Sequence, residues 1–147
     1  MSTPRRFPFI KAEGHAGSGS LFPWLPLKLS YSRPTVFNDA TLDLMGLLDT
    51  GATVNVLPYN IGAKLGVKWS EAQSDFYLSG TLADFPARSI VVTAEISGFK
   101  PVRLAFAWTK SNDVPVILGQ TNFFMEFDVC FFRDSKAFEI REKKSRA

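Results

Sequence analysis

Asp49 is the side chain in this sequence whose surroundings favour acid–base chemistry. It lies in the segment Leu47–Pro58, where an apolar strand delivers the carboxylate into a tight Thr50-Gly51 turn and a second apolar stretch follows. Apolar neighbours would disfavour the charged carboxylate unless backbone N–H groups of the turn donate hydrogen bonds to it. Gly51 permits that close approach of the backbone because it has no Cβ. The simpler alternative is an ordinary hairpin turn, since Asp and Gly are common turn residues.

The other reactive side chains offer less chemistry. His15 lies in a Gly- and Ser-rich link, and the sequence holds no second histidine to share a metal ion, so we expect it to be solvated. Cys130 lies between Val129 and Phe131. We expect it to be a small buried hydrophobic residue rather than a nucleophile. We therefore predict no metal site and no cofactor.

The elements that must position Asp49 are mainly strands, because apolar residues recur at every second position along much of the chain. This alternation covers residues 27–29, 42–48, 92–96, 102–108 and 127–131. Turn-forming clusters such as Ser97-Gly98 and Ser111-Asn112-Asp113 separate the apolar runs. Many short strands with frequent turns predict a small closed or sandwich-like β fold.

Two short segments break the alternation and favour helix. Pro58–Leu65 has proline at the first helical position and Gly66 as a stop signal. Gln120–Met125 follows an apolar run, and either Thr121 or Asn122 offers a cap. We expect one or two turns of helix in each.

Two segments resemble the retropepsin-like aspartic proteases. The first is Leu47-Leu48-Asp49-Thr50-Gly51-Ala52, followed at the family's distance by Val56-Leu57-Pro58. The second is Val116–Gln120, which resembles the apolar-apolar-Gly segment before the family's C-terminal helix. Between them, Phe76–Leu82 stands where the family carries the flap that closes over substrate, although Ser79-Gly80 also reads as an ordinary exposed turn. The resemblance implies an all-β fold: a small closed retropepsin-like β barrel with one or two short helices, which is dimeric.

By this resemblance, one chain holds half of an active site. No second Asp-Thr-Gly or Asp-Ser-Gly occurs in the sequence, and the chemistry needs two facing carboxylates that share one proton. A symmetric homodimer would supply the second Asp49. One carboxylate would act as general base on a water while its protonated partner hydrogen-bonds the scissile carbonyl. The implied activity is endopeptidase hydrolysis of peptide bonds without a cofactor.

The resemblance also assigns roles to the neighbours of Asp49. Thr50 and Gly51 would form the active-site turn and the dimer lock, and the partner would be an extended peptide held like an added strand. The expected substrate-binding residues are Ala52, Thr53, Leu78, Ser79, Gly80, Thr81 and Leu82. The expected supports of the site are Leu57, Ile117, Leu118, Gly119 and Gln120. The apolar arm Phe7–Ile10 and the strand-like Ala137–Ile140 are the candidates for an intersubunit sheet.

The sequence departs from the viral members at three positions. Thr53 stands where many of them carry an Asp, and Gln120 where they carry an Arg, so a neutral hydrogen bond would have to replace the ion pair that braces their dimers. The flap segment holds only Gly80 where viral flaps have several glycines, which suggests a stiffer or differently shaped lid.

Length and composition limit the architecture to one core. The 147 residues suit one domain, and 46% hydrophobic with 21% charged residues is not the composition of a disordered chain. We expect a flexible N-terminal arm and link over residues 1–20, the protease domain over 21–140, and a basic tail over 141–147.

Charge and hydropathy argue against several other classes. The net charge is +3, and the segments before residue 12 and after residue 140 each carry +3, which leaves −3 on the body. Nucleic-acid-binding proteins typically carry a basic stripe on the folded body. Here the basic excess lies in the two terminal segments, so nucleic-acid binding is disfavoured. No apolar run is long enough for a membrane span or a signal peptide. A single cysteine fits a reducing compartment, and we expect a soluble, cytoplasmic protein.

Two other functions stay open at this point. The first is a catalytically silent, dimeric peptide-binding or scaffolding module of the same fold, because fold analogy does not certify activity. The second is a nucleic-acid binder that works through its basic tails and would show a steep salt dependence.

Overall fold

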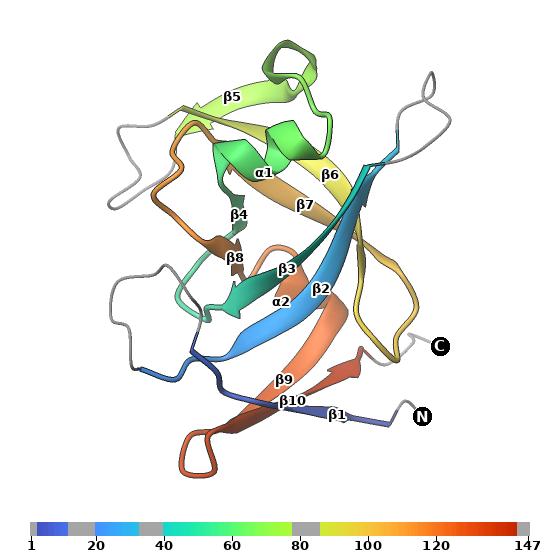
Figure 1. Cartoon of the computed structure of the whole chain (residues 1–147), viewed down its shortest axis with the longest axis vertical. Coiled ribbons are helices and arrows are strands. Elements are labelled where there is room, and N and C mark those ends of the chain that lie inside the picture. The colour runs from blue at the N-terminus through green and yellow to red at the C-terminus, as the bar shows by residue number, and fades with distance from the viewer. Residues whose placement is uncertain (1–2, 12–19, 33–39, 78–85, 144–147) are drawn as a thin grey trace.

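A computed structural model describes residues 3–11, 20–32, 40–77 and 86–143 of the chain. Within these residues strands dominate, as the sequence predicts (Figure 1). The strands are β1 Arg5–Pro8, β2 Trp24–Tyr31, β3 Ala40–Leu48, β4 Asn55–Leu57, β5 Gln73–Tyr77, β6 Pro86–Glu95, β7 Val102–Thr109, β8 Val116–Leu118, β9 Phe127–Phe132 and β10 Ala137–Glu142. The α-helices are α1 Tyr59–Lys64 and α2 Phe123–Glu126, and a short 3-10 helix covers Trp69–Glu71.

Six strands close into a barrel. Their order is β2-β3-β8-β4-β7-β6, and β2 pairs with β6 to complete the ring, while β5 extends the sheet beyond β6. The β3–β8 and β4–β7 pairs are parallel, and the other ladders are antiparallel. Closure satisfies the backbone groups that an open sheet would leave at its edges. The predicted small closed β barrel with one or two short helices is confirmed, and the described residues form two α-helices.

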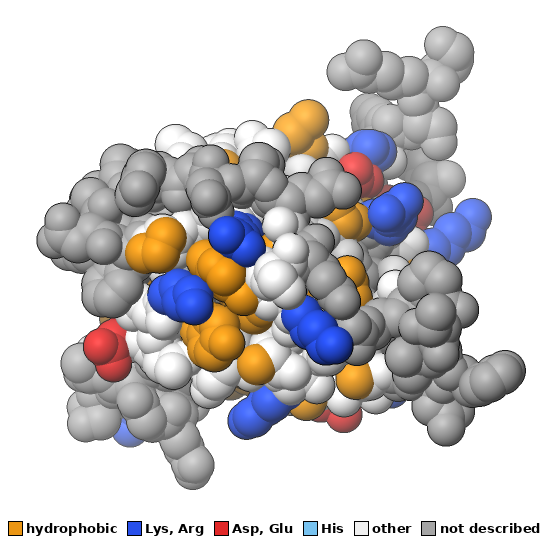
Figure 2. Space-filling model, turned by 90° about the horizontal axis from the view of Figure 1, so that it is seen from above, with side chains coloured by type: hydrophobic (Ala, Val, Ile, Leu, Met, Phe, Trp, Pro, Cys, Tyr) orange, Lys and Arg blue, Asp and Glu red, His pale blue; other side chains and the backbone are white. Residues whose placement is uncertain are grey.

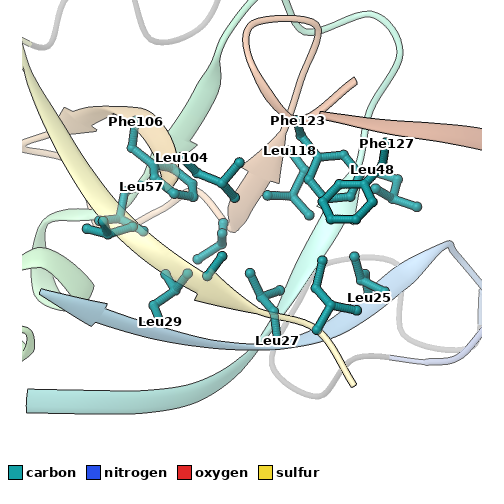
Figure 3. Packing of buried hydrophobic residues seen from close by; sticks show 14 of the residues in the cluster. Leu25, Leu27, Leu29, Leu48, Leu57, Leu104, Phe106, Leu118, Phe123 and Phe127 are labelled. Atoms are coloured by element: carbon teal, nitrogen blue, oxygen red, sulfur yellow. The ribbon is translucent and has the colours of Figure 1, made fainter. Parts of the chain in front are cut away.

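The barrel interior is filled by apolar side chains, which point inward from alternate positions of the strands. Leu25, Leu27 and Leu29 of β2 are buried at alternate positions, and the residues between them are exposed. Figure 3 shows these leucines pointing toward side chains from the opposite wall and from α2 and β9, namely Leu48, Leu57, Leu104, Phe106, Leu118, Phe123 and Phe127. Each fully buried side chain of this kind contributes about 1.5–3 kcal/mol, so this cluster dominates the stability of the fold.

An aromatic cluster fixes α1 against β7. The rings of Tyr59 and Trp108 stack with centroids 5.4 Å apart, and the Trp108 Nε1–H donates to the Tyr59 carbonyl (3.1 Å). Gly62 is needed in this helix because a Cβ there would lie 2.3 Å from the Trp108 ring. Lys110 lies over the rings of Tyr59 and Trp69. Seen from above, with α1 and β5 toward the viewer, the surface shows hydrophobic side chains among those of Lys and Arg (Figure 2).

Helix boundaries differ slightly from the prediction. Pro58 is the N-cap of α1 with an extended backbone rather than its first helical residue, and Gly66 has the positive φ of 86° that suits a stop. Asn122 is the N-cap of α2 but makes no side-chain capping bond. In the part of the chain that the structure describes, no helix has the length and apolar character needed to cross a membrane.

A second sheet, with the order β1-β10-β9, lies at the lower end of the barrel in Figure 1. Phe7 of β1 pairs with Phe138 of β10 within the same chain, and their rings stack with centroids 5.3 Å apart. Phe9 is only 7% exposed and belongs to the core. Residues 5–10 therefore belong to the folded unit rather than to a flexible arm, because their aromatic side chains gain more from burial than the chain loses on ordering.

The expectation that Cys130 is buried is wrong, because the residue is exposed. On β9 the side chains of Phe127 and Val129 lie on the face toward the core, and alternation places Cys130 on the opposite face. The small sheet covers the core with one face only.

Candidate active site

Asp49 is fixed at the carboxyl end of β3 by its neighbour strand. Leu48, the last residue of β3, pairs with Leu118 of β8 in parallel register. The next N–H along the chain, that of Asp49, donates to the Leu118 carbonyl (3.0 Å). Leu48 and Leu118 are both buried, whereas Asp49 is half-buried. The paired strands β3 and β8 thus hold Asp49 at the edge of the core, where its side chain is half-buried.

The turn after Asp49 solvates its carboxylate. The Gly51 N–H donates to Asp49 Oδ1 (2.9 Å), and the Ala52 N–H donates to the Asp49 carbonyl (3.1 Å). A Cβ at Gly51 would lie 3.3 Å from the same carboxylate oxygen. The backbone therefore approaches the carboxylate closely and donates a hydrogen bond to it.

The loop after the turn is held against the residues that follow β8. The Gln120 N–H donates to the Ala52 carbonyl and the Thr121 N–H to the Thr53 carbonyl, both at 2.9 Å. A Cβ at Gly119 would lie 2.5 Å from the Val54 carbonyl oxygen, closer than real Cβ atoms come to another heavy atom. The two chain segments can cross at this distance only because residue 119 is glycine.

Asn55 is a functional support that our reading of the sequence missed. It is fully buried at the start of β4, and its Oδ1 accepts from the Gly119 N–H (2.7 Å). Its Nδ2 donates to the Ala105 carbonyl and to Asn122 Oδ1, both at 3.0 Å. Asn122 Oδ1 also accepts from the Ala105 N–H (2.9 Å). The side-chain amides of buried Asn55 and half-buried Asn122 therefore tie β4, β7 and the segment after β8 together.

The signal for Asn55 was present in the sequence. It is the one polar residue in the run Val54–Leu57, and a polar side chain in a buried strand needs hydrogen-bond partners. Neither the identity nor the position of those partners follows from the local pattern, since Ala105 and Asn122 are distant along the chain.

The side chain of Gln120 braces the turn itself. Its Nε2 donates to the Thr50 carbonyl (2.8 Å). Thr53 and Gln120 offer a neutral hydrogen bond in place of the viral ion pair; the side-chain hydrogen bond that Gln120 makes goes to Thr50, the residue directly after Asp49. Because Thr50 and Gln120 are both exposed, this bond lies at the surface beside the carboxylate.

The other predicted site residues fall into three groups. Leu57, Leu118 and Gly119 are buried, and Ile117 and Ala52 are half-buried. Thr53 is exposed. The predicted flap residues Leu78, Ser79, Gly80, Thr81 and Leu82 lie outside the described residues. The strands on either side of them, β5 and β6, are antiparallel, with Tyr77 opposite Pro86.

Comparison with known proteins supports the fold. No protein-family model matches this chain, and no curated protein sequence matches it either. A crystal structure of a retropepsin-like aspartic protease from Rickettsia conorii is similar, with a TM-score of 0.61, 11% sequence identity, and coverage of 97% of this chain and 94% of that one. The EIAV protease in complex with the inhibitor HBY-793 matches with a TM-score of 0.46 and 21% identity, over 67% of this chain and 82% of that one. The first likeness shows that this chain has a retropepsin-like fold.

Proposed function

From a retropepsin-like fold that carries Asp49 at the end of β3, we propose that this chain is an aspartic endopeptidase that works as a homodimer. The observation that carries the proposal is the anchoring of Asp49. Its N–H is bonded to Leu118 and its carboxylate accepts from Gly51, so a rigid frame presents one half-buried carboxylate per chain. Rigid presentation of a reacting group is what lowers the entropic cost of catalysis.

Hydrolysis requires the Asp49 carboxylates of two subunits to face each other. Two carboxylates about 3 Å apart cannot both be ionised, so the pair shares one proton. The ionised Asp49 takes a proton from a bound water, and that water attacks the scissile carbonyl. The protonated Asp49 of the partner donates a hydrogen bond to the carbonyl oxygen as it becomes tetrahedral. In this arrangement the Thr50 hydroxyl locks the two turns across the dimer.

The substrate is an extended peptide. Its backbone is held by hydrogen bonds as an added strand, and its alternate side chains enter pockets on the two sides. Among the described residues, Ala52 bonds to the Asp49 carbonyl and Ile117 pairs with Leu47; both are half-buried and apolar. The resemblance assigns segment 78–82, which lies outside the described residues, to the flap. We expect hydrophobic side chains on both sides of the cleaved bond.

The test is cleavage of a mixed peptide library by the wild-type chain and by Asp49→Asn. The variant removes the titrating group and keeps the size of the side chain, so cleavage should disappear while sedimentation still shows the same oligomer. Asp43→Asn is the matched control, because Asp43 is an exposed aspartate on β3, the strand that leads into Asp49. Sensitivity of the wild-type activity to a statine-type inhibitor adds support. An unchanged rate in Asp49→Asn, or peptide binding by the wild-type chain without cleavage, contradicts the proposal.

A further inference from the structure

Three aromatic rings and two cations form one cluster where α1, the 3-10 helix and β7 meet. The ring centroids of Tyr59 and Trp69 lie 5.4 Å and 5.1 Å from that of Trp108. The Arg88 guanidinium lies 4.9 Å from the centroid of the Trp69 ring. Lys110 Nζ lies 4.7 Å from the centroid of the Trp69 ring and 5.3 Å from that of Tyr59. The attraction between a cation and an aromatic ring holds both charges in place.

The two cations of the cluster differ in what they leave for a partner. Arg88 is half-buried and donates to the Trp69 carbonyl, so its guanidinium is used within the cluster. Lys110 is exposed, and among the described residues it makes no ion pair. The rings therefore hold the Lys110 ammonium group in place, while its N–H donors face solvent.

Two further lysines extend the positive charge beside this cluster. Lys64 is the last residue of α1, and Lys68 directly precedes the 3-10 helix. Both side chains are exposed, and neither makes an ion pair within the part of the chain that the structure describes. We call the surface formed by Tyr59, Lys64, Lys68, Trp69 and Lys110 the lysine face.

The lysine face is positive although the body of the chain carries a net charge of −3. On the side of the molecule where α1 and β5 lie, Lys and Arg side chains surround hydrophobic ones, and Asp and Glu side chains appear toward the margin (Figure 2). Asp113, in the loop after Lys110, is exposed, and the side chains of Glu71 and Asp75 lie outside the described part of the structure. The described positive charges of the face therefore outnumber the negative ones.

The rings of the lysine face are not open to nucleobases. Tyr59 stacks on Trp108 with an angle of 6° between the ring planes, and Lys110 also lies over the Tyr59 ring. The Trp69 ring carries both Arg88 and Lys110. Proteins that bind single-stranded nucleic acids stack the bases on free aromatic rings. This face therefore lacks the stacking platform that a nucleic acid requires.

A membrane surface fits no better, because no large apolar side chain of the lysine face protrudes. Helices that bind a bilayer surface insert apolar side chains into it. Among the described residues, the large hydrophobic side chains that are exposed are Phe22, Val91, Met125 and Phe131, and none of them belongs to α1 or to the 3-10 helix. Ammonium groups around half-buried rings suit the carboxylates of an acidic peptide, which accept charged hydrogen bonds.

We propose that the lysine face binds an acidic segment of the protein substrate. The inference rests on the proposed function for the identity of the partner as a substrate. β4 connects the two sites, because it follows the loop after Asp49 and leads into α1 (Figure 1). The chain from Ala52 to Pro58 spans at most about 20 Å. An extended substrate covers the same distance with roughly six residues, so one polypeptide can occupy both sites.

The first test measures binding without catalysis. Fluorescein-labelled hexaglutamate is titrated with the Asp49→Asn chain, and fluorescence anisotropy gives the Kd. Hexaglutamate should bind about tenfold or more tightly than hexaglutamine, since several exposed charge contacts contribute. Added salt should weaken the binding of hexaglutamate, because exposed charges are screened. Equal affinities for the two peptides overturn the proposal.

Charge-reversal variants locate the binding surface. Lys64→Glu with Lys68→Glu should raise the Kd for hexaglutamate about tenfold. Lys110→Met keeps an apolar side chain against the rings and removes the charge, and it should raise the Kd about threefold. The matched control is Lys28→Glu with Lys100→Glu, which reverses two exposed lysines on β2 and on the loop between β6 and β7. Circular dichroism checks that each variant is folded. An equal loss in the control shows that net charge alone acts and overturns the proposal.

The remaining arms test the class of partner and the link to catalysis. An oligothymidylate, or vesicles containing phosphatidylserine, that bind more tightly than hexaglutamate and lose binding in Lys64→Glu with Lys68→Glu overturn the choice of an acidic peptide. A cleavable peptide that carries hexaglutamate roughly six residues from the cleaved bond, on one side or the other, should have a lower KM than its hexaglutamine counterpart, with the same kcat. Equal KM values with cleavage intact refute this inference alone. Binding of hexaglutamate at the lysine face without cleavage of any peptide refutes the proposed function alone.

Discussion

The Gly119 N–H donates to the side-chain Oδ1 of Asn55 over 2.7 Å, in the buried layer behind the Asp49 turn. Gly119 follows the strand that holds the Asp49 N–H, and Asn55 begins the strand that the Asp49 turn leads into. A single hydrogen bond therefore closes the frame around the carboxylate.

Asn55→Ala should destabilise the protein by about 1–3 kcal/mol. The substitution removes the acceptor of the buried Gly119 N–H and leaves that donor without a partner, and it also removes the Nδ2 donor to Asn122 Oδ1 and to the Ala105 carbonyl. Urea denaturation followed by tryptophan fluorescence measures the change. Asn60→Ala, at an exposed position of α1, is the control and should shift the midpoint little. Equal shifts of the midpoint in the two variants would show that the hydrogen bonds of Asn55 contribute no more to stability than an exposed side chain does.

Gly119→Ala should damage the fold, whereas Gly51→Ala should not. The new Cβ at position 119 would lie 2.5 Å from the Val54 carbonyl oxygen, which belongs to the backbone and cannot move away alone. At position 51 the nearest atom is the Asp49 carboxylate at 3.3 Å, the end of a side chain. We expect a loss of about 1–3 kcal/mol or more for Gly119→Ala, measured by thermal denaturation. A Gly119→Ala protein as stable as Gly51→Ala would contradict the close approach of Gly119 to the Val54 carbonyl.

Gln120→Leu should lower the rate of peptide cleavage more than it lowers stability. It keeps the bulk of the side chain and removes the Nε2 donor to the Thr50 carbonyl. An exposed hydrogen bond contributes about 0.5–1.5 kcal/mol at most, but this one restrains the residue next to Asp49. The measurement is kcat/KM alongside the denaturation midpoint. Loss of stability with full activity would assign Gln120 a structural role only.

Phe9→Ala should destabilise the fold by about 3–5 kcal/mol, as large-to-small changes in a core do. Phe9 is 7% exposed and packs near Phe138, whereas Phe22 is 45% exposed. Phe22→Ala is thus the matched control and should cost far less. If Phe9→Ala is as mild as Phe22→Ala, the N-terminal strand does not belong to the core.

The local patterns in the sequence predict the strands well but not their partners. Alternation of apolar residues locates β2, β3, β6, β7 and β9, because side chains of a strand point to opposite faces in turn. The pairing of β1 with β10 joins the two ends of the chain, and nothing in either segment alone specifies it. The parallel pairing of Leu48 with Leu118 could not be predicted for the same reason, since neither segment alone specifies its partner.

The candidate site was predicted as a turn but not as a network. Asp49, Thr50 and Gly51 carry a local signature, since the turn and its apolar flanks are contiguous. The partners of Asn55 are not contiguous, so their position depends on the completed barrel. Cys130 is instructive in another way, because the alternation of Phe127, Val129 and Phe131 already placed it on the other face of β9, and this should have outweighed its apolar neighbours.

The measurement that tests the central claim most directly is the activity of mixed dimers. Wild-type and Asp49→Asn chains are unfolded together, refolded at a fixed total concentration, and assayed for peptide cleavage over a series of ratios. If each active site needs one Asp49 from each subunit, mixed dimers are inactive and activity falls with the square of the wild-type fraction, to about one quarter at an equal mixture. Activity that falls in simple proportion, to about one half at an equal mixture, would mean that each chain acts alone and would contradict the shared dyad.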